Sequence, residues 1–370
     1  RLTEEEVEFV INSAVKILSQ RGFIKGSTYI LDSTDLFIAR KIKGAGTKRY
    51  KETKYDERKK KTIEIEVVRH GFKLIVLQEV KSRIIVAAKF VKLNEHESKY
   101  TLSLIRQAEE NLGGRKIKLL LIYRGFIDGV TLWKLKRIHG IDFIIGVKSN
   151  MRIATDARSH RGFEADKKSL FSGERREGDK RIKVIGISSL TTYDQYGDEE
   201  HGKRKYRKDF VGNPINVVVV VCWDGEEYEE GKEPVFMTSL SVEFPLDIID
   251  KYDLRSLIEN CCFREMKQGW NLGKFPKKTL AAIRAHVLLT VNMYSLNAAF
   301  IMEKGKKITK KGIRRLRDED MSTIHKLVVF ADDYFGIFDI EEFCIIVRAP
   351  PKVFFRVNPE EVKRRFGLED

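Results

Sequence analysis

Three side chains of different chemistry stand at helical spacing in the stretch 252–270, YDLRSLIENCCFREMKQGW. The apolar residues of this stretch follow the period of an amphipathic helix. Tyr252, Arg255 and Glu259 occupy positions i, i+3 and i+7, which directs a phenol, a guanidinium and a carboxylate to one spot. The alternative interpretation is a solvated helix face with an Arg–Glu pair. The spacing alone does not separate the two.

A second acidic candidate is Asp32, in the middle of the β-rich segment 29–38. An acid inside a strand is costly to bury unless it faces a site or a partner. Its polar neighbours Ser33, Thr34 and Asp35 leave open that the segment is only a strand edge. Acids from a first strand, from the end of a fourth strand and from a late helix can converge. Two-metal phosphoryl transfer needs such carboxylates, because they hold two divalent ions about 3.5–4 Å apart.

The elements around these residues predict an α/β fold: an RNase H-like mixed sheet flanked by helices and interrupted by a β-rich insertion. Period-2 patterns and continuous apolar runs predict strands, and 3.6-residue patterns predict helices. Along the chain we expect strands at 29–38, 72–79 and 83–93, a helix at 97–112, a strand at 117–122, a helix at 129–138 and a strand at 142–147. Three strands followed by alternating helices and strands, with a late helix, are typical of an RNase H-like domain.

Residues 151–245 differ from the segments on either side, because they are charged and contain strand patterns at 181–189, 215–222 and 235–242. We therefore expect a helical N-terminal segment (1–26), a first core part (27–150), this insertion (151–245), a second core part with the catalytic helix (246–345) and a C-terminal tail (346–370). The chain opens on Arg1 rather than Met, so we expect residues 1–26 to be the remnant of a larger N-terminal region. Polar residues in the apolar segment 277–301 favour a core helix over a membrane span.

The charge balance indicates a polyanionic partner. Lys and Arg number 70 against 54 Asp and Glu, a net charge of +16, which favours nucleic acid, although an unspecialised basic surface is the alternative. The basic stretch 40–61 predicts a mobile loop or a hairpin end that would bind phosphates beside a nucleic-acid site. The candidates for such contacts are Lys48, Arg49, Lys59 and Lys60.

Cysteine and histidine usage excludes other classes of site. The four cysteines form no CxxC pair and no disulfide framework, and no His/Cys pattern has zinc-ligand spacing. We therefore expect a reduced, cytoplasmic setting.

The sequence resembles the DDE transposases of bacterial and archaeal insertion sequences, in the group with the signature Tyr-x2-Arg-x3-Glu-x6-Lys. Tyr252, Arg255 and Glu259 match its first three members, and the segments LDST, RGFIDG and DDYFGIFDIEEF also resemble that group. The resemblance covers about residues 27–345. It implies cut-and-paste DNA transposition, in which water cleaves the element end and the freed 3′-hydroxyl attacks target DNA.

The same resemblance implies roles for individual residues and partners. Asp32 would be the first metal-binding acid and Glu259 the third, with Mg²⁺ or Mn²⁺ between them. Tyr252 and Arg255 would contact the DNA backbone near the scissile phosphate. The implied partners are double-stranded DNA, as terminal repeats and target, and a second copy of the chain in a synaptic complex. The implied location is the prokaryotic cytoplasm, associated with the nucleoid, with no membrane partner.

Two positions depart from the pattern of that group. Tyr123 stands where the second acid is expected, before Arg-Gly-Phe, and a phenol with a pKa of about 10 is a poor ligand for divalent ions. Asp128, five residues later, is a weak candidate substitute. Met266 stands in the place of the signature Lys, which favours core packing for Met266. Lys267 lies one position on, about 100° around a helix, and is a candidate phosphate contact.

Tyr123 keeps two other functions open. One is a transposase-derived DNA-binding protein that has lost catalysis. The other is a stand-alone RNase H-like nuclease, which the long insertion makes less favoured.

Overall fold

A computed structural model describes residues 3–56, 61–160, 170–178, 180–197, 213–275, 279–304, 327–331 and 334–338 of the 370-residue chain. The chain forms two compact units, Arg1–Glu303 and Lys304–Asp370. The boundary that we predicted at residue 345 therefore falls inside the second unit. Within the described residues of that unit, β12 (Leu327–Ala331) pairs antiparallel with β13 (Tyr334–Phe338). All other elements lie in the first unit, except for Lys304, the last residue of α7.

Five strands of the first unit form the core sheet, in the order β4-β3-β1-β5-β6. β3 runs antiparallel to both β1 and β4, whereas β5 runs parallel to β1 and β6. This order and these directions confirm the RNase H-like mixed sheet. The strand bounds are β1 (Thr28–Ile38), β3 (Lys61–Glu79), β4 (Ile85–Lys92), β5 (Leu119–Ile122) and β6 (Asp142–Gly146).

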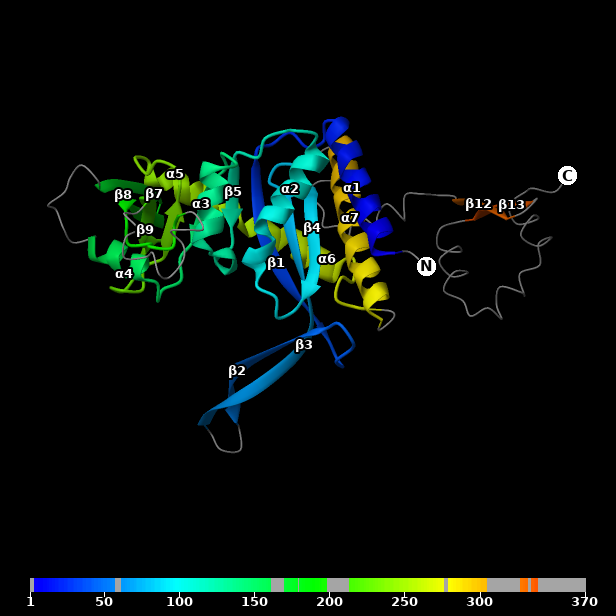
Figure 1. The fold of residues 1–370 in the computed structure, drawn as a ribbon, viewed down its shortest axis with the longest axis horizontal. Coiled ribbons are helices and arrows are strands. Elements are labelled where there is room, and N and C mark those ends of the chain that lie inside the picture. The colour runs from blue at the N-terminus through cyan, green and yellow to red at the C-terminus, as the bar shows by residue number, and fades with distance from the viewer. Residues whose placement is uncertain are drawn as a thin grey trace. The chain divides into compact units, whose positions relative to one another are not determined.

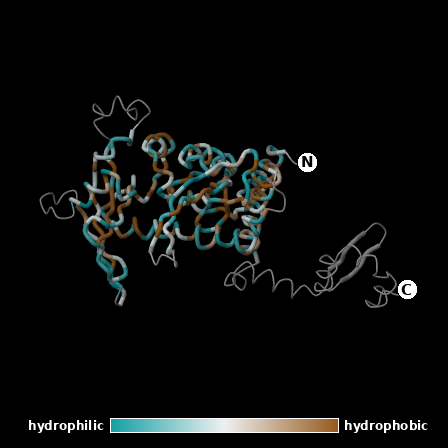
Figure 2. The backbone as a smooth tube through the Cα atoms, turned by 90° about the horizontal axis from the view of Figure 1, so that it is seen from below, coloured by the Kyte–Doolittle hydropathy of each residue, from teal (hydrophilic) through white to brown (hydrophobic). Residues whose placement is uncertain are grey.

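Helices cover both faces of this sheet. Leu31 and Ile75 pack in one apolar cluster with residues of α1, α2 and α3. Side chains alternate between the two faces along a strand, so Gln78, three residues after Ile75, points to the opposite face. There it donates a hydrogen bond to Tyr294 of α7, so α7 covers this second face. Figure 2 shows hydrophobic and hydrophilic segments alternating throughout this unit. The helices are α1 (Glu4–Gln20), α2 (Thr101–Leu112), α3 (Gly129–Arg137), α5 (Pro245–Asp253), α6 (Arg264–Gln268) and α7 (Leu280–Lys304).

The insertion extends the core sheet instead of forming a separate layer. β11 (Val235–Thr238) pairs antiparallel with β6 on one side and with β9 (Ile215–Trp223) on the other. β8 (Lys180–Leu190) and β7 (Leu170–Glu177) follow, so that one sheet of 11 strands includes both core and insertion. The helix α4 (Arg152–Ser159) and the strand β7 were missed, because both are short and highly charged. A two-residue strand, β10 (Glu226–Glu227), pairs with β9.

The basic stretch predicted as a loop or a hairpin end is a long β-hairpin. β2 (Gly46–Asp56) pairs with β3 from Gly46 opposite Gly71 to Asp56 opposite Lys61. Figure 1 shows the hairpin projecting from the sheet, away from the helices. β3 therefore begins 11 residues earlier than the strand that we predicted from residue 72. Its first half was missed although Ile63, Ile65 and Val67 alternate with polar residues, a strand pattern, because we assigned the whole basic stretch to a loop or a hairpin end.

The late helix predicted over 252–270 is wrong as one helix. α5 starts already at Pro245 and ends at Asp253. Tight turns follow, in which the Arg255 N–H donates a hydrogen bond to Tyr252 O (2.9 Å) and the Leu257 N–H donates one to Leu254 O (3.1 Å). A π-helical segment, Ile258–Phe263, and the short α6 follow. Wide turns of this kind are frequent at functional sites.

Among the described residues one helix, α7, is long and apolar enough to cross a membrane by length and composition, but 44% of its apolar stretch is buried inside the fold. Its buried face packs on the sheet. The Tyr294 hydroxyl accepts a hydrogen bond from Gln78 (3.3 Å), and Ser295 Oγ accepts one from Ile85 N–H (3.2 Å). These are the contacts of the core helix predicted there.

Candidate active site

Five of the predicted site residues meet at the carboxyl end of β5: Asp32, Tyr123, Tyr252, Arg255 and Glu259. β1 and β5 are parallel with Leu31 beside Ile122, so Asp32 on β1 lies next to Tyr123, which follows β5. The Tyr123 N–H donates to Leu31 O at 3.2 Å. α5 and the π-helical segment bring Arg255 and Glu259 to the same place. The sheet register and the late helical segments thus assemble residues far apart in sequence.

Arg255 joins the two acids through a single nitrogen. Its Nη1 donates to Asp32 Oδ2 at 2.8 Å and to Glu259 Oε1 at 2.9 Å. The side chains of Asp32 and Arg255 are 3% and 16% exposed, whereas that of Glu259 is 52% exposed. One guanidinium therefore bridges a buried carboxylate and an exposed one.

Two aromatic rings flank this guanidinium. Its central carbon lies 5.4 Å from the ring centroid of Tyr123 and 5.7 Å from that of Tyr252, distances at which aromatic faces attract cations. The Tyr252 ring also packs against Phe236, at 4.7 Å between centroids. Its hydroxyl donates to Ile122 O at 3.4 Å, and burial raises the pKa of Tyr252. Phe236 and Ile122 thus hold the Tyr252 ring in place, and the ring in turn supports the Arg255 guanidinium.

Asp32 is the acid most changed by its surroundings. Burial raises its pKa to about 7, and the nearby Glu259 carboxylate adds to this, while the Ser33 N–H and Arg255 oppose it. The Ser33 N–H donates to Asp32 Oδ1 at 2.7 Å, so only Oδ2 faces the site. A carboxyl group that titrates near neutrality gains its charge readily when a further cation approaches.

Asp128 is used elsewhere in the fold. It is the N-cap of α3, and its Oδ2 accepts hydrogen bonds from the N–H (3.0 Å) and the hydroxyl of Thr131. Such a cap stabilises a helix start by about 1 kcal/mol. This contact explains the residue without a metal, and it weakens Asp128 as a substitute for the missing acid.

Of the other predicted contacts, Lys48 and Arg49 lie on β2 and Lys267 lies on α6. Met266 is fully buried, which confirms core packing, and Lys267 is exposed on α6. Lys48 pairs with Asp35 at 3.0 Å, and Arg49 pairs with Glu66 at 3.6 Å. Lys59 and Lys60 lie outside the described residues.

The donor set suits one divalent ion better than two. Carboxylates of Asp32 and Glu259 are the oxygen ligands that Mg²⁺ and Mn²⁺ prefer, and Arg255 Nη1 is a stand-in cation between them. Among the described residues no group of three His, Cys, Asp or Glu side chains could hold a metal ion. A second ion would lack an acidic ligand, because Tyr123 stands in that position.

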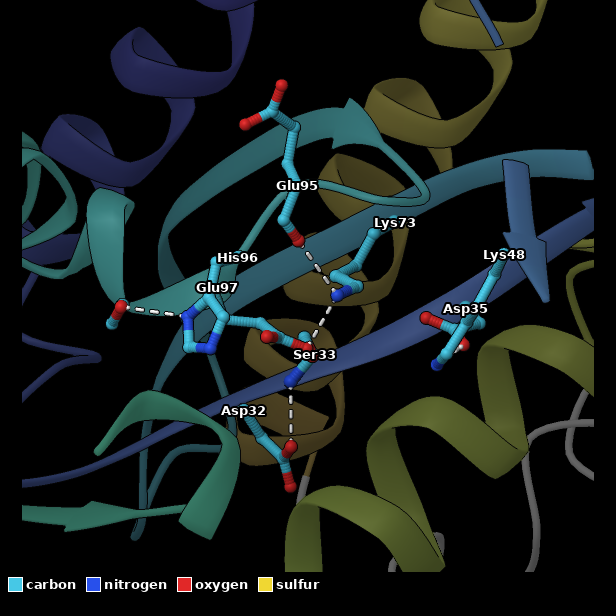
Figure 3. Close-up of polar contacts among 9 residues, drawn as sticks. Asp32, Ser33, Asp35, Lys48, Lys73, Glu95, His96 and Glu97 are labelled. Atoms are coloured by element: carbon cyan, nitrogen blue, oxygen red, sulfur yellow. Dashed lines mark hydrogen bonds and ion pairs between the residues drawn. The ribbon is translucent and has the colours of Figure 1, made fainter. Parts of the chain in front are cut away.

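An ion pair between buried Lys73 and half-buried Glu97, behind Asp32, was missed from the sequence. Figure 3 shows Glu97 beside Ser33, on the far side of β1 from the Asp32 carboxylate. Glu97 Oε1 accepts hydrogen bonds from Lys73 Nζ (2.6 Å) and from Ser33 Oγ (3.2 Å), and Lys73 Nζ also donates to Glu95 O (3.1 Å). The Lys73 side chain is only 6% exposed. The signal was a lysine inside the apolar strand sequence GFKLIVL.

Lys73→Met should destabilise the protein by about 2 kcal/mol, because it leaves the half-buried Glu97 carboxylate without its partner. The double variant with Glu97→Gln should recover part of this loss. Urea unfolding at pH 7 measures both changes. Lys89→Met is the matched control on β4, since Lys89 forms a longer, more exposed pair with Glu8 (3.4 Å) and should change stability by less than about 1 kcal/mol.

The same pair should make stability depend on acid. Burial raises the pKa of Glu97, but hydrogen bonds from Lys73, the backbone and Ser33 outweigh burial and leave it below its ordinary value of 4.5. A lowered folded pKa contributes stability above the unfolded pKa, which is lost as the pH falls through the folded one. The unmodified protein should therefore lose this stabilisation as the pH falls below about 4.5, and Glu97→Gln, which lacks the stabilisation at every pH, should not show that loss. An unchanged acid dependence would contradict the assignment.

An RNase H-like sheet with one acid on its first strand and another on a late helical segment has the architecture in which nucleic-acid phosphoryl-transfer enzymes hold divalent ions. The family model of the transposase DDE domain matches residues 25–296, well over half of the chain. The protein therefore belongs to the DDE transposase domain family, whose members generally use divalent metals.

One solved structure with a similar chain is the cryo-EM structure of the piggyBac transposase synaptic complex with hairpin DNA. The two chains are 11% identical, with a TM-score of 0.35, over 95% of this chain and 72% of that chain. The comparison with curated proteins gives no match.

Proposed function

We propose that this protein is a DNA transposase that cleaves phosphodiester bonds at the ends of a mobile element and joins the freed ends to target DNA. One observation carries this proposal. In a chain of the DDE transposase family, Asp32 and Glu259 come from distant segments to share one cation-binding place at the end of β5.

The chemistry assigned to the site is two successive phosphoryl transfers. Water attacks the phosphodiester at the element end and releases a 3′-hydroxyl, which then attacks a phosphodiester of the target and releases a target 3′-hydroxyl. A Mg²⁺ or Mn²⁺ ion held by Asp32 and Glu259 would supply Lewis-acid stabilisation of the phosphoryl oxygens and activation of water. Arg255 would orient the phosphate by hydrogen bonds, and Tyr252 would fix the floor of the site.

The basic hairpin supports double-stranded DNA as the partner. Lys48, Arg49 and Lys51 pair with acids on the strand surface, and these basic side chains are 48–75% exposed. Exposed pairs of this kind contribute little to stability, so phosphates can replace the carboxylates at small cost. Lys267 on α6, and Lys59 and Lys60, are further proposed phosphate contacts.

Arg49→Ala with Lys51→Ala should weaken DNA binding and reduce its dependence on salt. Each lost phosphate contact should lower the slope of log K against log[salt] by about 1. Fluorescence anisotropy with a labelled duplex at several salt concentrations measures the slope. The matched control is Arg176→Ala with Lys180→Ala, which removes two exposed, ion-paired cations from the β7–β8 hairpin. An equal loss of DNA affinity in both double variants would mean that DNA responds to the overall positive charge of the protein and not to the hairpin in particular.

Tyr123 favours a second candidate, a transposase-derived DNA-binding protein without catalysis. It keeps the basic hairpin and the fold but lacks the second acid. A stand-alone RNase H-like nuclease is a third and weaker candidate. For the transposase we also propose action as a homodimer in a synaptic complex, in the prokaryotic cytoplasm next to the nucleoid.

Nicking of a plasmid that carries the DNA flanking the coding region of this protein tests these candidates. The transposase predicts Mn²⁺-dependent nicking at the element ends that is lost in Asp32→Asn and in Glu259→Gln. Nicking at many unrelated positions would favour the nuclease. Binding without nicking, by both the unmodified protein and Tyr123→Asp, would favour the DNA-binding protein.

A further inference from the structure

Arg255 occupies the position between Asp32 and Glu259 that a divalent ion would take. A single atom, Nη1, lies 2.8 Å from Asp32 Oδ2 and 2.9 Å from Glu259 Oε1. Mg²⁺ binds carboxylate oxygens at about 2.0–2.1 Å, so an ion shared by these two oxygens would need the space that Nη1 fills. The guanidinium and the ion therefore exclude each other.

The surroundings of Arg255 allow it to leave. Arg255 lies in the turn between α5 and the π-helical segment, outside any regular helix. Its Nε is buried and has no hydrogen-bond partner among the described residues. A guanidinium with donors still unused binds a phosphate through two parallel hydrogen bonds.

Tyr123 strengthens the closed arrangement. An acid in its place would attract a divalent ion to the site, whereas its ring stabilises the guanidinium at 5.4 Å. The Tyr252 ring acts in the same direction at 5.7 Å. Two aromatic rings and two carboxylates thus hold one monovalent cation.

We propose that Arg255 closes the DNA-free site as an exchangeable cation and moves to a DNA phosphate when DNA binds, which frees Asp32 and Glu259 for a divalent ion. This inference rests on the proposed function, because it takes DNA as the source of the phosphate. Since binding equilibria are reciprocal, DNA and the divalent ion must each tighten the binding of the other.

Mn²⁺ titration of the full chain, followed by electron paramagnetic resonance, tests the exchange without relying on catalysis. We expect Arg255→Gln to bind Mn²⁺ about 10-fold more tightly than the unmodified protein in the absence of DNA. Arg124→Gln is the matched control, because Arg124 also lies over the Tyr123 ring, at 6.0 Å, and it should leave the affinity unchanged. Arg255→Gln that binds Mn²⁺ as the unmodified protein does, or more weakly, would overturn the proposal.

A second measurement needs no variant. A 30-base-pair duplex should tighten Mn²⁺ binding by the unmodified protein about 10-fold, and this coupling should vanish in Arg255→Gln. An absent coupling in the unmodified protein, with the duplex bound, would also overturn the exchange. Failure of the two proposals is distinguishable. Coupled binding without nicking would refute the transposase alone, and Mn²⁺-dependent nicking without coupling would refute the exchange alone.

Discussion

Tyr123→Asp should increase Mn²⁺-dependent cleavage of element-end DNA by about 10²-fold or more. The substitution places a carboxylate after β5, next to Asp32, and so supplies the third acid that a second ion requires. A metal ion that stabilises charge in the transition state contributes several kcal/mol, and about 2.7 kcal/mol corresponds to 10²-fold in rate. The new acid should also compete for Arg255, whose guanidinium now lies over the Tyr123 ring. Single-turnover nicking assays with both proteins measure the change.

Two controls separate this effect from a change in packing. Tyr123→Phe keeps the ring over which Arg255 lies and removes only the hydroxyl, so cleavage should stay within a few-fold of the unmodified protein. Asp32→Asn added to Tyr123→Asp should abolish the gain, since the new acid acts only together with the first. Equal cleavage by Tyr123→Asp and Tyr123→Phe would show that position 123 does not hold an ion.

The composition of the site could be predicted from the sequence, whereas the way its residues are held could not. Asp32 is buried within β1, which pairs with a strand on each side, so the strand-edge alternative that the sequence left open is wrong. Arg255 and Glu259 are in contact although the predicted helix is broken. They are four residues apart in sequence, and the turn followed by the π-helical segment still brings their side chains together. Helical spacing therefore predicted the right contact, although this stretch is not one continuous helix.

Contacts that depend on sheet register lie beyond such reasoning. Lys73 and Glu97 are 24 residues apart, and they meet only because β3 and the segment after β4 are placed by strand pairing. The continuation of the core sheet into the insertion depends likewise on β11 pairing with β6. Local sequence patterns predicted β6 and β11 as strands, but no local pattern shows that the two are neighbours in the sheet.

The second large effect concerns Gly71, where the hairpin leaves the core sheet. Gly71 lies opposite Gly46 on β2 and opposite Phe37 on β1. A Cβ atom at this position would lie 2.0 Å from Leu36 O and 3.1 Å from Phe37 Cα, and backbone atoms cannot move aside as a side chain can. Gly71→Ala should therefore destabilise the protein by about 3 kcal/mol, as overpacking does. Urea unfolding measures this loss.

Gly273→Ala is the matched control, because a Cβ there meets nothing within 4 Å and should change stability by less than about 0.5 kcal/mol. Gly71→Ala has a further consequence if the hairpin binds DNA. The clash pushes β3 away from Leu36 on β1, which should turn the hairpin relative to the strand that carries Asp32. DNA affinity should then fall at a temperature where the variant is still folded, and the salt slope should fall with it. Lost stability with an unchanged slope would mean that the hairpin binds DNA wherever it points, and that Gly71 serves the sheet alone.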